Sequence, residues 1–238
     1  MLHITDRMVT LAESAGKHRF AADIGTDHGY LAMHLVRSGL AQYVYAIDNK
    51  EGPAAKARRN IAEEGFGDSV RCVVADGFDG LRGLQPAERP GAVFIAGIGG
   101  IVTAEILERG MDVVSNVDRL VLQPANREDA LREFLYSRKM KILDEYILED
   151  AGRYFVVFVV DPREMEEHPR GKFDILYGRF IPFKRDCITG RYLQRKLHFV
   201  REALAQLEES RGQEDIKESM EAHMHWLQEL LARFGQLD

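Results

Sequence analysis

The stretch Ala21-Ala22-Asp23-Ile24-Gly25-Thr26-Asp27-His28-Gly29-Tyr30-Leu31 decides the fold of this chain. It predicts a buried strand that ends at Asp23, a tight glycine turn, and a helix that begins near Tyr30. Small residues in such a turn let backbone N–H groups approach a ligand, and the helix adds its positive N-terminal end. This order is typical of the place where doubly wound α/β folds hold a nucleotide-like cofactor.

Two carboxylates distinguish this turn from a dinucleotide-binding turn. The dinucleotide fingerprint reads G-x-G-x-x-G and offers backbone donors to a pyrophosphate. Here the turn reads D-x-G-x-D-x-G, with carboxylates at Asp23 and Asp27. These would repel a pyrophosphate and suit a cationic ligand. S-Adenosylmethionine, which carries a sulfonium and an amino group, is such a ligand.

The composition limits the class of protein. The 238 residues are enough for one α/β domain and a smaller appendage, and a net charge of −6 means that any nucleic-acid surface is local. Cys72 and Cys187 form no CxxC pair, so we expect neither a zinc site nor a disulfide framework. Residues 1–7 lack the layout of a signal peptide, and the apolar run at 155–160 suits a buried strand. We therefore expect a cytoplasmic monomer without a metal or a membrane association.

Strand-like and helical patterns alternate along the first two thirds of the chain. Strands are expected at 20–24, 43–47, 70–75, 92–96 and 119–122, and helices at 5–15, 30–38, 53–63, 100–109 and 127–138. Apolar strands separated by helices predict a parallel sheet with right-handed crossovers. Two further runs, at 141–148 and 154–160, predict an antiparallel hairpin that closes the sheet. The expected fold class is α/β, with a seven-stranded Rossmann-like sheet.

A different pattern follows the charged, proline-containing stretch at 161–171. We expect a domain boundary there, which divides the chain into 1–161 and 162–238. Two heptad-like seams then predict a coiled-coil-like helical hairpin, with Arg211-Gly212-Gln213 as the break. The seam residues are Leu193, Leu197, Val200, Leu204 and Leu207, then Ile216, Met220, His223, Leu227, Leu230 and Phe234.

Charge is unevenly divided in this hairpin. Residues 179–201 hold seven Lys or Arg against Asp186 alone, whereas residues 202–238 hold three against nine Asp or Glu. One interpretation is a solvated hairpin with complementary charges on its two arms. The other is a basic arm that follows a phosphate backbone, with Tyr192, His198 and Phe199 inside it, although Phe199 also fits a core position. The candidate RNA-binding residues are Lys184, Arg185, Arg191, Arg195, Lys196 and Arg201.

Acidic residues end three successive strands. Asp48 lies 23 residues after Gly25, where a carboxylate commonly holds ribose hydroxyls, and Asn49 follows it. Asp76 and Gly77 follow the next strand, where a carboxylate could bind an adenine amino group. Taken singly, Asp48 could merely cap a helix and Asp76-Gly77 could be an ordinary turn. With Asp23, the three carboxylates fit one nucleoside that lies across the carboxyl edge of the sheet.

Two further strand ends are candidates for the site of chemistry. Ala96-Gly97-Ile98-Gly99-Gly100 allows close backbone approach, although tight packing explains Gly100 equally well. Gln123-Pro124-Ala125-Asn126 carries two side-chain amides that suit the edge of a base, while Asn126 could instead cap the next helix. His28 and Tyr30 flank the first turn and could border the acceptor.

Together these motifs resemble the bacterial tRNA (adenine-N1)-methyltransferase family of the TrmK type, which modifies adenine 22 in the tRNA D-loop. The resemblance rests on DIGTDHGYL, the Asp48 strand end, ADGF at 75–78, AGIGG at 96–100, LQPAN at 122–126 and ILEDAGRYFVVFVV. It is strongest from 20 to 160. Where relatives read Q-P-N, this chain reads Gln123-Pro124-Ala125-Asn126.

The resemblance implies a class I methyltransferase that uses S-adenosylmethionine and acts on tRNA. It assigns Asp23, Gly25 and Asp27 to the methionine portion, Asp48 to the ribose and Asp76 to the adenine, with Gly97 and Gly99 at the transfer site. The catalytic candidates are Asp27, Gln123 and Asn126. The cofactor-binding candidates are Asp23, Gly25, Thr26, Asp27, His28, Gly29, Tyr30, Asp48, Asn49, Asp76, Gly77, Ala96, Gly97, Ile98 and Gly99.

Three other functions stay open at this point. A methyltransferase for a small molecule or protein would share every cofactor feature. A nicotinamide oxidoreductase fits the Asp48 spacing, but Asp23 and Asp27 fit it poorly. A relative that binds cofactor or RNA without turnover would carry the same motifs.

Overall fold

The computed structural model of this chain describes residues 4–208 and 213–234. The chain forms two compact units, Met1–Leu176 and Tyr177–Asp238.

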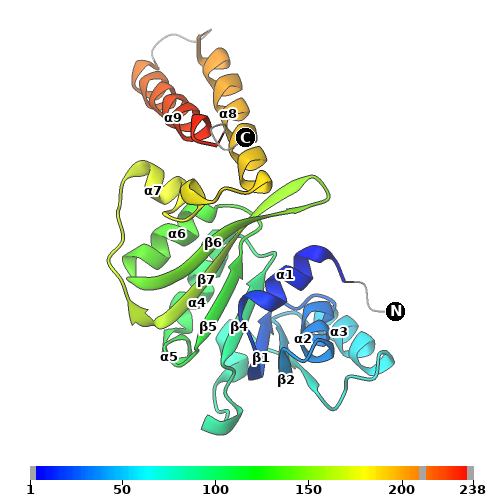
Figure 1. Cartoon of the computed structure of the whole chain (residues 1–238). Helices are drawn as coiled ribbons and strands as arrows, with labels where there is room; N and C mark the ends of the chain where they lie inside the picture. Colours follow the sequence, from blue (N-terminus) through cyan, green and yellow to red (C-terminus); the bar gives the residue numbers. More distant parts are fainter. Residues whose placement is uncertain (1–3, 209–212, 235–238) are drawn as a thin grey trace. The chain divides into compact units, whose positions relative to one another are not determined.

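A seven-stranded sheet forms the centre of the first unit (Figure 1). Its order is β3-β2-β1-β4-β5-β7-β6. The first five strands are parallel, whereas β7 runs antiparallel to both β5 and β6. The predicted seven-stranded Rossmann-like sheet with its terminal hairpin is confirmed. The strands are β1 (His18–Ile24), β2 (Ala41–Asp48), β3 (Val70–Val74), β4 (Ala92–Ala96), β5 (Arg119–Gln123), β6 (Met140–Asp150) and β7 (Arg153–Met165).

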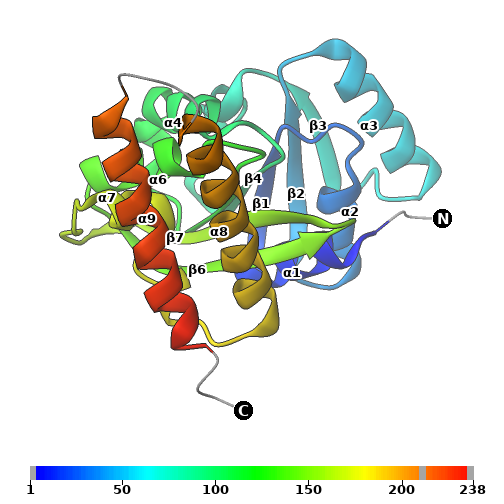
Figure 2. The same cartoon turned by 90° about the horizontal axis from the view of Figure 1, so that it is seen from above.

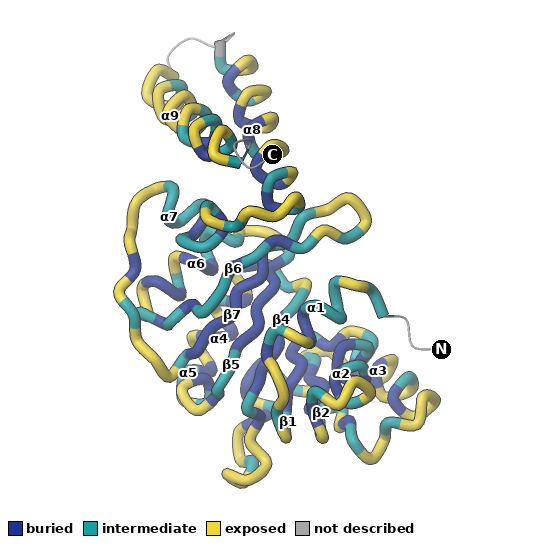
Figure 3. Tube along the Cα trace, viewed as in Figure 1, coloured by how far each residue is buried: buried dark blue, intermediate teal, exposed yellow. Residues whose placement is uncertain are grey.

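Helices cover both faces of the sheet (Figures 1 and 2). Buried side chains of α1, α2 and α3 share one core with the strands, while α4 and α6 pack together on the other face. The central strands are buried along most of their length (Figure 3). The helices of this unit are α1 (Asp6–Ser14), α2 (Tyr30–Arg37), α3 (Glu51–Glu63), α4 (Gly100–Arg109), α5 (Met111–Val114), α6 (Glu128–Ser137) and α7 (Lys172–Tyr177, whose last residue belongs to the second unit), with short 3₁₀ turns η1 (Gly77–Leu81) and η2 (Pro86–Glu88).

The strand order reverses at β1, which lies between β2 and β4. The chain runs from β1 outward to β2 and β3, then returns to β4 on the other side. In open α/β sheets a crevice forms at such a point, outside the carboxyl ends of the strands, because the two connecting helices leave in opposite directions. The ends of β1, β2 and β4 therefore define where a ligand can bind.

Strand β7 continues beyond the residue at which the sequence predicted a boundary. It runs to Met165 and includes Pro162, because Met140 of β6 pairs with Met165 across a register shift and β5 pairs with β7 only as far as Val160. A proline lacks the N–H that a ladder needs, so it is tolerated at such an irregularity. The stretch at 161–165 is therefore strand and not linker.

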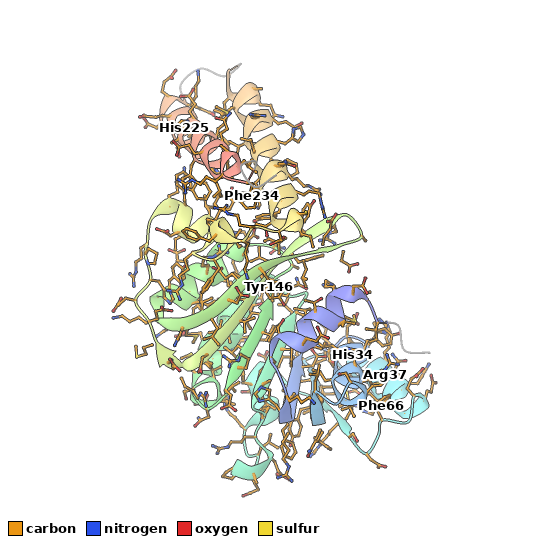
Figure 4. The ribbon with its side chains drawn as sticks, in the orientation of Figure 1. His34, Arg37, Phe66, Tyr146, His225 and Phe234 are labelled. Atoms are coloured by element: carbon orange, nitrogen blue, oxygen red, sulfur yellow. The ribbon has the colours of Figure 1, made fainter. Side chains whose placement is uncertain are left out.

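Helix α1 is firmly attached to the first unit. Thr5 accepts a hydrogen bond from the Met8 N–H and caps the helix. Leu11 is buried in the core, and the Ser14 hydroxyl pairs with the hydroxyl of Tyr146 on β6. Figure 4 labels Tyr146. Burial raises the pKa of Tyr146 above its ordinary value. These contacts fix the position of α1 beside the sheet.

The second unit contains η3 (Ile181–Phe183) and a helical hairpin of α8 (Cys187–Glu208) and α9 (Glu214–Ala232). The arms are antiparallel, because Phe234 after α9 lies close to Gly190 near the start of α8. The seam residues of α8 from Leu193 to Leu204 are buried, as are Leu227 and Leu230 of α9. Ile216 is 52% exposed, so the second seam begins later than predicted. Of the predicted break, Arg211 and Gly212 lie outside the described residues.

Within residues 4–208 and 213–234, no helix combines the length and the apolar character needed to cross a membrane.

Candidate active site

The glycine turn after β1 is bound to β2. Gly25 has φ +82°, and the N–H groups of Gly25 and Thr26 both donate to the Ile47 carbonyl, at 2.8 and 3.1 Å. A Cβ on Gly25 would lie 2.7 Å from Ile98 Cδ1. Glycine is therefore required here for both its backbone angle and its size. These two N–H groups therefore bind the sheet and are not available to a ligand.

Asp23 provides a buried carboxyl group at the end of β1. It is 5% exposed, and Thr26 Oγ1 donates a hydrogen bond of 2.7 Å to Asp23 Oδ2. Burial raises the pKa of Asp23 from 3.8 to about 6; the Thr26 hydrogen bond opposes this shift, and the charge of Asp48 adds to it. A cation bound beside Asp23 would stabilise the ionised form that burial disfavours.

A cavity of about 290 Å³ opens beside Asp23. Asp23 and Thr26 lie on its polar side, and Tyr30 lies near the start of α2. Gly97 borders it with φ +78°, and the space where a Cβ would lie is open. The full lining is Arg7, Met8, Leu11, Asp23, Gly25, Thr26, Asp27, His28, Tyr30, Leu31, Ala96, Gly97 and Ile98. We call this the inner cavity.

A second cavity, of about 420 Å³, lies at the ends of β2 and β3. Asp48 lines it and accepts the Lys50 N–H at 2.9 Å through Oδ1. Asp76 also lines it, and its carboxylate binds Arg109 at 3.1 Å. The predicted residues Asn49 and Gly77 complete this side, and Val102 and Ile106 supply an apolar wall. We call this the nucleoside cavity.

The two cavities share three residues: Gly25, Asp27 and Ile98. Asp27 is largely open to solvent, with its side chain 70% exposed, and its Oδ2 lies 3.4 Å from His28 Nε2. The His28 ring stacks on Tyr30, with ring centroids 5.4 Å apart. The residues that sequence patterns placed at one site therefore border two adjoining spaces.

Two predicted cofactor residues have structural contacts instead of a place in either lining. A Cβ on Gly29 would lie 3.4 Å from Ile61 of α3, so Gly29 lets α2 approach α3. Gly99 lies against Asn126, whose Oδ1 would be 3.0 Å from a Cβ.

The loops after β4 and β5 are joined by three backbone hydrogen bonds. The N–H groups of Gly97, Ala125 and Gly100 donate to the carbonyls of Gln123, Ile98 and Asn126, at 2.9, 2.9 and 2.8 Å, respectively. A Cβ on Gly100 would lie 2.1 Å from the Arg127 carbonyl oxygen, so tight packing explains this glycine. The two loops form one rigid border of the inner cavity.

The two amides after β5 lie in different environments. Gln123 is fully buried; its Oε1 accepts from Arg7 Nη1 at 2.6 Å and its Nε2 donates to the Pro124 carbonyl at 2.9 Å. Both the oxygen and the nitrogen of this amide therefore have protein partners. Asn126 is exposed and does not cap α6, because the N-cap is Arg127, in the left-handed region at φ +52°.

Sequence reasoning missed the contribution of α1 to the inner cavity. Arg7, Met8 and Leu11 all line it. The helical spacing of Met8 and Leu11 marked one apolar side of a helix, but nothing in the pattern indicated that Arg7 would meet the end of β5.

In the second unit, four of the six predicted basic residues lie on α8, and the other two, Lys184 and Arg185, precede it. Arg191, Arg195 and Arg201 are exposed, and the Arg195 guanidinium lies 5.6 Å from the centre of the Phe199 ring. Phe199 is 49% exposed and is therefore not a core residue, whereas Tyr192 is buried. Phe183, next to Lys184, is 71% exposed. The arm thus presents cations and aromatic rings together.

The chain resembles known proteins over nearly its whole length. A family model described as TrmK, tRNA (adenine(22)-N(1))-methyltransferase, matches residues 21–229. The tRNA (adenine(22)-N(1))-methyltransferase of Bacillus subtilis is 29% identical over 222 residues, which cover 92% of each chain.

Solved structures agree with this family match. The crystal structure of the B. subtilis m1A22 tRNA methyltransferase TrmK has a TM-score of 0.82 at 25% identity and covers 97% of this chain and 100% of its own. That of Streptococcus pneumoniae Sp1610, a candidate tRNA (m1A22) methyltransferase, in complex with S-adenosyl-L-methionine has a TM-score of 0.82 at 27% identity and covers 96% of this chain and 100% of its own.

The sheet with its antiparallel β7 and the acidic strand ends define a Rossmann-like methyltransferase. The chain belongs to the TrmK family of tRNA (adenine(22)-N(1))-methyltransferases, and the resemblance seen in its motifs is confirmed.

Asp23→Asn should change how stability depends on pH. Because the folded-state pKa is raised from 3.8 to about 6, the folded protein holds this proton more tightly than the unfolded chain. The contribution of the protonated Asp23 carboxyl to the free energy of unfolding is fully present below pH 3.8 and is lost as the pH rises through 6. The variant should therefore gain about 3 kcal/mol relative to wild type between acid and neutral pH, as measured by urea unfolding. The exposed Asp68→Asn is the control, and a gain independent of pH would contradict the burial argument.

Proposed function

We propose that the protein transfers the methyl group of S-adenosylmethionine to N1 of adenine 22 in the D-loop of tRNA. The observation that carries this proposal is the pair of adjoining cavities with carboxylates at three strand ends, in a chain of the TrmK family. The B. subtilis relative carries this activity in its name.

The residues fit the cofactor portion by portion. Asp48 and Asn49 would hold the ribose, and Asp76 the adenine amino group, against the apolar side chains of the nucleoside cavity. Asp23 would hold the cationic amino group of the methionine portion in the inner cavity. The shared residues Gly25 and Asp27 would then lie where these portions join. When bound, S-adenosylmethionine supplies an electrophilic methyl group on a sulfonium.

The acceptor needs positioning more than activation. Adenine N1 attacks with its own lone pair, the carbon–sulfur bond breaks with its electron pair left on sulfur, and the adenine becomes cationic. Catalysis can therefore consist largely of holding the reactants near attack distance. N1 lies on the Watson–Crick edge, so the base must be unpaired and turned out of its stack. The exposed Asn126 beside Gly99 is the amide that can meet the base.

Asp27→Asn should lower kcat by about tenfold while leaving the fold intact. The carboxylate lies at the junction of the two cavities, where it can stabilise the positive charge that develops on the adenine. Its exposure limits the effect until tRNA covers it. Single-turnover methylation would measure the change, with Asp68→Asn as an exposed control. Full turnover in Asp27→Asn would contradict this role.

The proposed reaction is tested with labelled methyl donor and an unmodified tRNA transcript that has adenine at position 22. Digestion to nucleosides should give labelled 1-methyladenosine, and a transcript with guanine at that position should not be labelled. Label in another nucleoside, or in protein or small molecules from an extract and not in tRNA, would overturn the proposal in favour of another methyltransferase. No label in any acceptor, with the cofactor bound, would favour a non-catalytic relative.

We also propose that residues 162–238 contact tRNA through the basic arm of α8. Exposed guanidinium groups beside exposed aromatic rings suit a phosphate backbone with unstacked bases. The triple change of Arg191, Arg195 and Lys196 to Glu should weaken tRNA binding by tenfold or more and reduce the slope of log affinity against log salt by about 2. Fluorescence anisotropy at several salt concentrations would measure both.

Three exposed cations on α3, Lys56, Arg58 and Arg59, provide the matched control. Their change to Glu should leave tRNA affinity and its salt slope nearly unchanged. Cofactor binding should be intact in both sets of variants. Equal losses in the two sets would mean that net charge, and not the α8 arm, determines affinity.

We further propose that the protein acts as a monomer in the cytoplasm. Cys72 and Cys187 are free thiols, which fits a reducing compartment. Light scattering of the purified protein with and without tRNA would test the monomer; a constant dimer mass would contradict it.

A further inference from the structure

Arg7 gives the inner cavity a positive charge that the sequence motifs did not predict. It projects from α1 and, of the residues that line this cavity, is the only Lys or Arg within the described chain. Its side chain is 22% exposed, so its charge is partly shielded from solvent. The same cavity contains the carboxylates of Asp23 and Asp27. The space therefore has charged groups of both signs on its border.

Three elements of the first unit hold Arg7 in place. Its Nη1 donates to Gln123 Oε1 at 2.6 Å, its Nε lies 3.2 Å from Asp150 Oδ2, and its guanidinium carbon lies 4.9 Å from the centre of the Phe155 ring. The Gln123 amide is itself fixed by its bond to the Pro124 carbonyl. These contacts leave the Nη2 amino group without a hydrogen bond to any described residue. Arg7 is thus oriented in advance and retains donors for a ligand.

The amino-acid portion of the proposed cofactor has charges that match this arrangement. It carries an ammonium group, which suits Asp23, and a carboxylate, which the acidic residues of the motifs would repel. A guanidinium is the side chain best suited to a carboxylate, since it combines a fixed charge with parallel N–H donors. A pocket with an anion and a cation can therefore recognise both ends of an α-amino acid.

We propose that Arg7 binds the α-carboxylate of the methionine portion, and that Gln123 is a positioning residue that acts through Arg7. This inference rests on the proposed cofactor site. Under this proposal Gln123 supports cofactor binding, whereas its position in the sequence suggested a contact with the base. It also makes α1 part of the cofactor site, beyond the strand-end motifs.

The test compares ligands that differ only in the amino-acid portion, with calorimetry as the readout. S-Adenosylhomocysteine has the carboxylate, its decarboxylated analogue lacks it, and 5′-methylthioadenosine lacks both charged groups. Arg7→Gln should weaken binding of S-adenosylhomocysteine by about 10- to 100-fold and leave the affinities for the other two ligands unchanged. Arg7→Lys should recover part of the loss, because it keeps the charge but not the planar pair of donors.

Arg153→Gln is the matched control. Arg153 also lies over the Phe155 ring, at 5.3 Å, but it is exposed at the start of β7 and does not line the inner cavity. It should bind all three ligands as wild type does.

Each contrary result has a distinct meaning. Equal losses for all three ligands in Arg7→Gln would overturn the inference and assign Arg7 to the docking of α1, which thermal unfolding would register. Unchanged S-adenosylhomocysteine binding with weaker tRNA binding would overturn it in favour of a phosphate contact. Failure of the wild-type protein to bind S-adenosylhomocysteine would instead overturn the proposed cofactor itself.

Discussion

The contact between Gly25 and Ile98 fixes the point where the two cavities meet. Gly25 follows β1, Ile98 follows β4, and the Ile47 carbonyl of β2 receives the Gly25 N–H, so three strand ends converge on one residue. A side chain at Gly25 would occupy the space of Ile98, and its φ of +82° disfavours any other residue. The position of the nucleoside cavity relative to the inner cavity depends on this close approach.

The way in which the loops use their backbone donors explains the kind of ligand that the site accepts. The N–H groups of Gly25 and Thr26 bind β2, and that of Gly100, at the start of α4, binds the Asn126 carbonyl. A phosphate site needs such donors free. Here charged side chains take over recognition instead. Arg127, which follows the loop after β5, has a left-handed backbone that costs about 1–3 kcal/mol in a non-glycine residue.

Sequence patterns predicted the architecture well because it depends on periodicity and on glycine chemistry. The strand runs, the turn at Gly25 and the carboxylates at Asp23, Asp48 and Asp76 all follow from local residue choice. The fate of individual polar groups could not be predicted, because it depends on partners distant in sequence. Gln123 meets Arg7 across 116 positions, and Asp76 meets Arg109 across 33. Pro162 suggested that the strand ends before it, but β7 tolerates this proline because the pairing of β6 with β7 shifts register there.

The ion pair between Asp76 and Arg109 has a consequence for how the two substrates respond to ionic strength. An adenine amino group can reach Asp76 only by sharing or displacing Arg109, and both side chains are about half exposed, so dissolved ions weaken their attraction. Added salt therefore loosens a competitor of the proposed nucleoside contact, while it would weaken the proposed contact of the α8 cations with phosphate. Because this competitor is loosened while the ionic contacts at the inner cavity are screened, cofactor affinity should change less with salt than tRNA affinity, which titrations of each ligand alone would reveal. The saltier the solution, the more the enzyme should be found loaded with cofactor but without tRNA.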